Sequence, residues 1–333
     1  MLEVTALGWT LTIGVIVALL ALDLALGVLR PHVVGFREAA GWSIFYIAVA
    51  IAFGLVFGSV AGWNFGTEYF AGYIVEKSLS VDNLFVFVII MSTFAVPERY
   101  QQEALTFGII IALVLRVVFI ALGATLLNLF SFMFLIFGLI LIYTAVQLFR
   151  HRDEDPSVDD NGLVKAARRW LPVTEDYVDG KMITRVDGKR MVTPLFLVLL
   201  AIGSTDILFA LDSIPAVFGV TEQAYIVLVA NAFALLGLRA LFFLVKGLLD
   251  RLVYLSTGLS VILAFIGFKL ILHWAHKAVS PSVPEVSTLV SLGVIIGILI
   301  VTTVASLIRS GRDPSLKAHA GSLQAHPDRQ PHQ

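Results

Sequence analysis

The sequence predicts an all-α, polytopic membrane protein of about nine transmembrane helices, in which two groups of three helices form an inverted-topology repeat. Of the 333 residues, 58% are hydrophobic and 14% are charged, whereas soluble domains carry about 25% charged residues. The apolar residues gather in nine runs, each long enough to cross a bilayer as a helix. Two stretches 124 residues apart also share the pattern Ser-x-Asp-x-Leu-Phe, which indicates an internal repeat.

The expected helices follow the apolar runs along the chain. They cover residues 7–29, 41–60, 72–95, 104–126, 128–149, 194–219, 224–246, 253–273 and 286–308. The first run has no basic segment before it and is longer than the apolar core of a signal peptide, so we expect it to remain as a helix. Five helices thus fall in residues 1–149 and four in residues 194–308.

Lysine and arginine set the expected orientation, because cytoplasmic segments are enriched in these residues. With the N-terminus outside, the inner segments hold 18 of them and the outer segments hold only Lys277. We therefore expect a multi-pass protein of a bacterial inner membrane, with the N-terminus outside and the C-terminus in the cytoplasm.

The repeat extends beyond the shared motif. Arg116 aligns with Arg239 after a gap of one residue, so the two units cover about residues 72–149 and 196–273. Each unit has three helices, and an odd number makes the second unit enter the membrane from the opposite face. Chance similarity between leucine-rich helices is the alternative, which the joint match of Asp, Leu-Phe and Arg disfavours.

Acidic residues inside the apolar runs are the main clue to function. Asp82 and Asp206 occupy equivalent positions in the two motifs, about ten to twelve residues from a helix end and so at mid-depth. An ionised, unpaired side chain there costs about 2.5–3.5 kcal/mol, so a proton, a basic side chain or a metal ion must neutralise it. The candidate metal ligands are Glu76, Asp82, Asn83, Asp206 and Asp212, with Asp23, Leu211 (through its backbone oxygen), Ser213 and Asn231 as additional candidates.

Helical spacing groups some of these candidates. Glu76 and Asn83 are seven residues apart and share a helix face, and Asp206 and Ser213 repeat this relation. Pro215 cannot donate to the carbonyl four residues earlier, so we expect a kink and a free backbone oxygen there. Carboxylates, an amide, a hydroxyl and a carbonyl form an all-oxygen set, which suits manganese, magnesium or calcium.

The alternative interpretation is that the acids only form ion pairs with Arg116 and Arg239. Two arginines would then have to neutralise at least four acids. Lys77 and Lys269 do not help, because both lie near the outer ends of their helices and are expected to extend toward the interface.

Two candidate residues have two interpretations each. Asp23 is either a fifth acid of the site or an interfacial residue near Arg30. Asn231 is either a ligand or, as is commoner, an interhelical hydrogen-bonding group. The sequence leaves both alternatives open.

Residues 150–193 form the one sizeable loop. Residues 163–171 combine helical spacing of apolar residues with basic neighbours, which predicts an amphipathic surface helix. Asp187-Gly188 predicts the turn of a β-hairpin. We favour an ordinary cytoplasmic loop over a regulatory domain.

Residues 309–333 are polar and include three histidines, and we expect a disordered cytoplasmic tail rather than a metal-binding segment.

Several function classes are disfavoured. The net charge of −1 gives no reason to expect nucleic acid as a partner. The chain has no cysteine and therefore no disulfide or thiolate metal site. It has no nucleotide-binding loop, Gly-x-Ser-x-Gly or His-Glu-x-x-His motif, so we expect neither an enzyme nor an ATP-driven pump, and no tightly bound cofactor.

Three stretches resemble the TerC family of membrane proteins, and its Alx-like bacterial members most closely. The resemblance covers about residues 7–308 and is most specific at Gly72–Asn83, Phe209–Ala216 and Leu235–Leu241. Members of the family are implicated in tellurium resistance, in manganese efflux and in supplying metal to exported proteins. The resemblance implies that Glu76, Asp82, Asn83, Asp206 and Asp212 are ion-site residues. The second motif of the family usually has a Glu three residues before its first Asp, where this chain has Gly203.

These observations predict a transporter that exports a divalent metal cation, with manganese the first candidate. The carboxylate site lies at mid-membrane, the lipid bilayer surrounds the helices, and protons are candidate counter-ions. A non-transporting scaffold that helps to assemble or metallate other proteins, or a membrane protein associated with tellurium resistance, is the alternative. Nothing in the sequence sets the oligomeric state.

Overall fold

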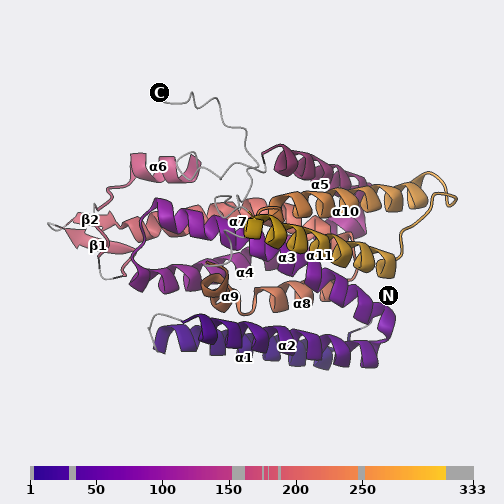
Figure 1. The fold of residues 1–333 in the computed structure, drawn as a ribbon, viewed down its shortest axis with the longest axis horizontal. Helices are drawn as coiled ribbons and strands as arrows, with labels where there is room; N and C mark the ends of the chain where they lie inside the picture. Colours follow the sequence, from indigo (N-terminus) through magenta and orange to yellow (C-terminus); the bar gives the residue numbers. More distant parts are fainter. Residues whose placement is uncertain are drawn as a thin grey trace.

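A computed structural model describes residues 4–29, 35–151, 162–174, 176–178, 180–186, 189–246 and 252–312. In this part of the chain the fold is an α-helical bundle with one two-stranded antiparallel sheet. The long helices run roughly parallel to one another, the sheet extends beyond one end of the bundle, and the short helix α6 lies beside that end (Figure 1). The all-α fold class predicted from the apolar runs is confirmed.

The elements follow the chain in a simple order. Before the loop, the helices are α1 (Ala6–Leu29), α2 (Phe36–Ala61), α3 (Trp63–Thr93), α4 (Glu98–Leu129) and α5 (Met133–Arg150). The loop holds α6 (Gly162–Trp170), β1 (Ile183–Val186) and β2 (Lys189–Val192). After it come α7 (Pro194–Phe218), α8 (Ala224–Leu235), α9 (Leu238–Lys246), α10 (Leu255–Ala278) and α11 (Thr288–Arg312).

The number of membrane spans is lower by hydropathy than the nine predicted. Among the described residues, seven helices are long and apolar enough to cross a membrane, or eight if α8 and α9 form one span. The long helix left out is α3, which has 31 residues but carries the charged residues Glu68, Glu76, Lys77 and Asp82. Whether α3 crosses the bilayer as a ninth span stays a prediction.

Several helices are longer than their apolar runs. α3 begins at Trp63 instead of about residue 72, and α4 begins at Glu98 instead of about residue 104. The apolar runs were cut short by polar residues such as Glu68 and Gln101, which sit in the helices' outer turns. Hydropathy marks the stretch that suits hydrocarbon, whereas the hydrogen-bonded helix continues beyond it.

The predicted helix at residues 224–246 is broken in two. α8 ends at Leu235 and α9 starts at Leu238, with a bend of 44° between them. Gly237 makes the break, since its φ of +72° lies in the region that favours glycine and a Cβ there would lie 2.5 Å from the Tyr46 ring. By contrast, α7 continues through Pro215 to Phe218, so the helix is not interrupted where we expected a kink.

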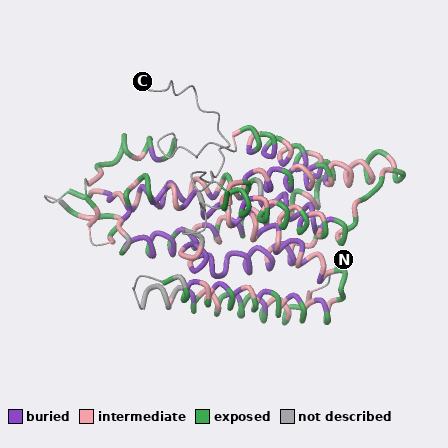
Figure 2. Tube along the Cα trace, viewed as in Figure 1, coloured by how far each residue is buried: buried purple, intermediate pink, exposed green. Residues whose placement is uncertain are grey.

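Three pairs of helices organise the bundle. α5 packs along α10, α3 packs against α8, and α4 packs against α7. Gly138 and Gly267 allow α5 and α10 to approach closely, because a Cβ on either one would lie 2.8 Å from the other's carbonyl oxygen. α8 is buried along nearly its whole length. By contrast, α1 and α2 lie at one side of the bundle and have many exposed residues (Figure 2).

The loop has the two elements that the sequence predicted. α6 lies at the expected place, and Val164 on its inner side is buried in the same core cluster as residues of α7. β1 and β2 pair in the expected antiparallel register, with Ile183 opposite Val192. The predicted turn at residues 187–188 and the predicted tail beyond Arg312 lie outside the described residues.

Orientation can be tested with single cysteines, because the natural chain has none. We expect Ser282→Cys, in the loop between α10 and α11, to react with a membrane-impermeant maleimide added to intact spheroplasts. Arg185→Cys, exposed in the hairpin, should react only after the membrane is permeabilised. The reverse pattern would contradict the N-out, C-in orientation predicted from the Lys and Arg distribution.

Candidate ion site in the helix bundle

Arg116 is the largest fully buried side chain in the described part of the chain, and it lies near the middle of α4. Its guanidinium forms ion pairs with Glu76 of α3 and with Asp206 of α7; the Nη2–Oδ1 distance to Asp206 is 3.8 Å. The three side chains are 1%, 0% and 2% exposed. Three helices therefore contribute one charge each to a buried cluster, and all three residues come from the central part of their helix.

Asn83 belongs to the same cluster. In the amide orientation that satisfies both of its neighbours, its oxygen accepts from Arg116 Nη2 at 3.0 Å and its nitrogen donates to the Leu79 carbonyl at 3.1 Å. Glu76 and Asn83 thus contact the same guanidinium, as their seven-residue spacing predicted. Ser80, on the same stripe of α3, is also fully buried.

The charges of this cluster do not balance. One guanidinium faces two carboxyl groups, so with both of them ionised these three side chains carry one negative charge in excess. Asp206 Oδ2 and Ser213 Oγ, seven residues apart on α7, are buried and have no hydrogen-bond partner among the described residues. Buried oxygens of this kind are costly unless a proton, water or cation satisfies them.

The rest of the predicted ligand set is only partly placed. Asp82 and Asp212 lie in α3 and α7, but their side chains are outside the described residues. Within the described part of the chain, no three His, Asp or Glu side chains are grouped as a metal site. Gly203 lies on α7 near Ile111 of α4, one turn before Asp206. The five-ligand metal site therefore stays a prediction.

Asp23 forms a second buried ion pair with Arg239. Arg239 Nη2 donates to Asp23 Oδ1 at 3.5 Å, and the Tyr46 hydroxyl donates to the same oxygen at 3.1 Å. Arg239 therefore pairs with the acid in α1, whereas the ion-pair interpretation expected it to pair with acids of the two motifs in α3 and α7. Arg30, the other partner that we considered, lies outside the described residues.

Lys77 differs from expectation, whereas both interpretations of Asn231 stay predictions. Lys77 was predicted to extend toward the outer interface, which is wrong: its ammonium donates to the carbonyls of Ala234 and Leu236 at the break between α8 and α9. Asn231 is buried in α8, and its amide nitrogen makes no hydrogen bond with any described residue, so the interhelical bond that we considered for it is not formed by that nitrogen.

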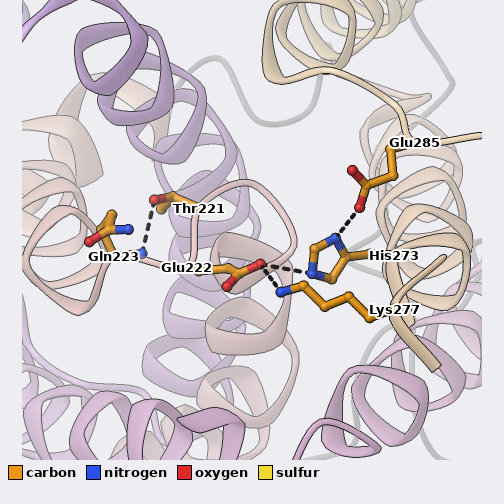
Figure 3. Close-up of polar contacts among 6 residues, drawn as sticks. All are labelled: Thr221, Glu222, Gln223, His273, Lys277 and Glu285. Atoms are coloured by element: carbon orange, nitrogen blue, oxygen red, sulfur yellow. Dashed lines mark hydrogen bonds and ion pairs between the residues drawn. The ribbon is translucent and has the colours of Figure 1, made fainter. Parts of the chain in front are cut away.

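A third polar cluster was missed by the sequence reasoning. Figure 3 shows His273 of α10 between two carboxylates, with Glu222 2.7 Å from Nε2 and Glu285 2.8 Å from Nδ1. Lys277 also donates to Glu222, at 2.9 Å. The cluster borders a cavity of about 430 Å³ that Glu68 and Lys269 also line. These residues come from α3, from α10 and from two loops that are far apart in the sequence, so no local motif indicated that they lie together.

The basic side chains next to Glu222 lower the pKa of its carboxyl group. This residue lies in the loop between α7 and α8, and the hydrogen bond from His273, followed by the charge and hydrogen bond of Lys277, lowers its pKa to about 2. Both ring nitrogens of His273 face carboxylate oxygens, so both contacts are hydrogen bonds only when the imidazole carries two protons. Through these polar contacts the cluster ties the loop after α7 and the loop after α10 to α10.

The fold and the buried charges define a class: a polytopic α-helical membrane protein with an ionic site inside its helix bundle. The chain belongs to the integral membrane protein TerC family, whose sequence profile matches residues 61–313. This agrees with the resemblance seen at the three stretches Gly72–Asn83, Phe209–Ala216 and Leu235–Leu241. No solved structure matches the fold at a significant level.

Curated relatives extend over most of the chain. An uncharacterized membrane protein of Mycobacterium tuberculosis is 47% identical over 315 residues, which cover 91% of this chain and 79% of the relative. A Salmonella typhi protein named membrane-bound redox modulator Alx is 36% identical over 325 residues, covering 94% and 98%. The Arabidopsis thaliana thylakoid membrane protein TERC is 42% identical over 254 residues, covering 76% and 66%.

Removing the buried guanidinium should destabilise the protein strongly. Arg116→Met leaves Glu76 and Asp206 without a cation, and breaking a buried ion pair in this way costs about 3–5 kcal/mol. The double variant Arg116→Met/Glu76→Gln should be more stable than the single variant, because only one carboxylate then lacks a cation. The free energy of unfolding of each purified variant in detergent, compared with that of wild type, measures both effects. Equal stability of wild type and Arg116→Met would contradict this account of the cluster.

Glu222 should contribute stability that is lost in acid. Because its folded-state pKa is below the ordinary value of 4.5, the contribution is complete above about pH 4.5 and disappears as the pH falls toward 2. The side chains are nearly half exposed, so solvent screening limits the effect to about 1 kcal/mol. Melting curves between pH 6 and pH 3 should show a smaller loss for Glu222→Gln than for wild type. The exposed control Asp176→Asn should match wild type. If the melting temperature of Glu222→Gln falls with pH as steeply as that of wild type, Glu222 does not carry this acid-sensitive stability.

Proposed function

We propose that this protein is a transporter that exports a divalent metal cation, with manganese the first candidate, through a mid-membrane site that includes Glu76 and Asp206. One observation carries the proposal: two fully buried carboxylates share a single buried guanidinium in the centre of three packed helices. The surplus negative charge attracts a cation to a place where an unpaired charge is costly. A site of this kind at the centre of a membrane bundle is typical of an ion pathway.

The donor atoms favour a hard cation. The described donors are carboxylate, amide and hydroxyl oxygens from Glu76, Asn83, Asp206 and Ser213, and Mn²⁺, Mg²⁺ and Ca²⁺ prefer oxygen ligands. The two remaining acids, Asp82 and Asp212, lie six residues beyond Glu76 and Asp206, in the same two helices. The proposal assigns them to the same pathway.

The helix contacts support an inverted repeat of three plus three helices. If α3, α4 and α5 correspond to α7, α8–α9 and α10, then the pairing of α3 with α8 is the counterpart of the pairing of α7 with α4. The corresponding helices α5 and α10 pack on each other, which is consistent with a two-fold axis that passes between them. In this proposal α3 is the ninth span, and the units rock against each other to expose the site to either side.

A scaffold function is the second candidate, favoured by the basic and partly apolar surface of the loop at residues 150–193. α6 carries three basic residues and exposes Trp170, which is 79% accessible, and the hairpin beside it is also basic. Such a surface could serve a protein that assembles or metallates other proteins. The name redox modulator belongs to the Salmonella relative, and this chain has no cysteine with which to carry out thiol chemistry.

Manganese efflux distinguishes the two candidates. Cells that lack the protein, loaded with radioactive manganese, should export the ion faster when wild type is supplied. Asp206→Asn should abolish this gain, because the carboxylate that lies farther from the Arg116 guanidinium is lost, and Glu76→Gln should reduce it at least tenfold. The control Asp176→Asn, which changes an exposed loop carboxylate in the same way, should export normally at equal expression.

Two other results would decide against the exporter. Full efflux by the double variant Glu76→Gln/Asp206→Asn would exclude the buried carboxylates as the ion site. Loss of function only in variants of α6 and the hairpin would favour the scaffold. Repeating the assay in vesicles with and without a proton gradient then identifies the counter-ion: flux that is indifferent to the gradient removes protons from the proposal.

A further inference from the structure

The break between α8 and α9 creates a group of buried backbone oxygens. A helix end leaves carbonyls without intrahelical partners, and here the end lies inside the bundle: Ala234 and Leu236 are 0% and 1% exposed. The left-handed conformation of Gly237 turns the chain away before α9 begins. Each of these oxygens needs a donor or a cation, because buried carbonyls without partners are costly.

Lys77 supplies that cation from a different helix. Its Nζ lies 3.0 Å from the Ala234 oxygen and 3.4 Å from the Leu236 oxygen. Among the described residues, no carboxylate lies within ion-pair distance of this ammonium, although Glu76 precedes it in sequence and pairs with Arg116 instead. Within the described part of the chain, the ammonium therefore contacts backbone oxygens and no carboxylate, as a bound metal cation at a helix break does.

The surrounding residues fix the position of these oxygens. The Tyr46 ring packs against Gly237, and its hydroxyl donates to Asp23. Asp23 in turn pairs with Arg239, two residues after the glycine. Helices α1 and α2 thus hold one side of the break while Lys77 of α3 holds the other. A rigid pair of carbonyls facing a single positive charge has the form of a monovalent-cation site.

We infer that Lys77 is a tethered cation that occupies a binding position for a free monovalent ion at the break in α8–α9. Unwound helix ends in transporters coordinate Na⁺ through such carbonyls. An ammonium group on a side chain provides the same charge without an ion from solution. The native protein then has no requirement for Na⁺ or K⁺ at this position, and shortening Lys77 converts the position into an alkali-ion site. This inference does not depend on which ion the protein transports.

Ion-specific rescue of a lysine variant tests the inference. Purified wild type, Lys77→Ala and Lys77→Met are melted in detergent in NaCl, KCl, NH₄Cl or N-methylglucamine chloride at one ionic strength. In N-methylglucamine chloride we expect both variants to melt about 5 °C below wild type. At least one of Na⁺, K⁺ and NH₄⁺ should restore half or more of this loss in Lys77→Ala. Lys77→Met should not be restored, because its side chain fills the space.

Two controls separate this effect from general salt stabilisation. Wild type and Lys77→Arg, which keep a tethered positive charge, should melt within about 1 °C of their own value in all four salts. Lys277→Ala, which removes the lysine that contacts Glu222, should show no preference among the four cations. The inference is overturned if Lys77→Ala is as stable as wild type, melts equally in every salt, or cannot be recovered folded even in concentrated NaCl or KCl.

Discussion

The structure depends on the burial of Arg116 between Glu76 and Asp206. These residues join α4 to α3 and α7 in the middle of the bundle, where the interior screens charge weakly. Because a guanidinium presents its donors in a fixed plane, the pair constrains how the three helices slide and rotate against each other. When both carboxyl groups are ionised, Arg116 neutralises only one of them. The stability of the cluster then depends on a further proton or cation that neutralises the other.

The two sequence repeats use their arginines differently. Arg116 and Arg239 align, yet Arg116 binds acids of α3 and α7 whereas Arg239 binds Asp23 of α1. The helix that carries Arg239 is broken just before it, and α1 and α2 support that break. Helices α1 and α2 therefore support the part of the chain that carries Arg239, whereas Arg116 is held by α3 and α7. The two aligned arginines thus lie in different charge environments.

The sequence predicted the overall fold better than the details of the site. Hydrophobic runs located the helices, and the amphipathic stretch and the Asp-Gly dipeptide located α6 and the hairpin. The seven-residue spacing of Glu76 and Asn83 correctly placed both on one helix face, and their shared contact is Arg116. The break at Gly237 was not foreseen, because leucines flank the glycine and its close contact with the Tyr46 ring comes from another helix. Partners such as Asp23 with Arg239, or Lys77 with Ala234, lie more than 150 residues apart, and helical periodicity carries no information about them.

The central claim is that the buried carboxylates hold the exported divalent cation, and direct binding tests it most closely. Free Mn²⁺ gives an electron paramagnetic resonance signal that disappears when the ion binds, so titration of the purified protein counts bound ions without any transport assay. The account predicts one saturable site in wild type and in Asp176→Asn, and its loss in Asp206→Asn. Unchanged Mn²⁺ binding by a folded Asp206→Asn protein, or no saturable binding by wild type, would contradict it.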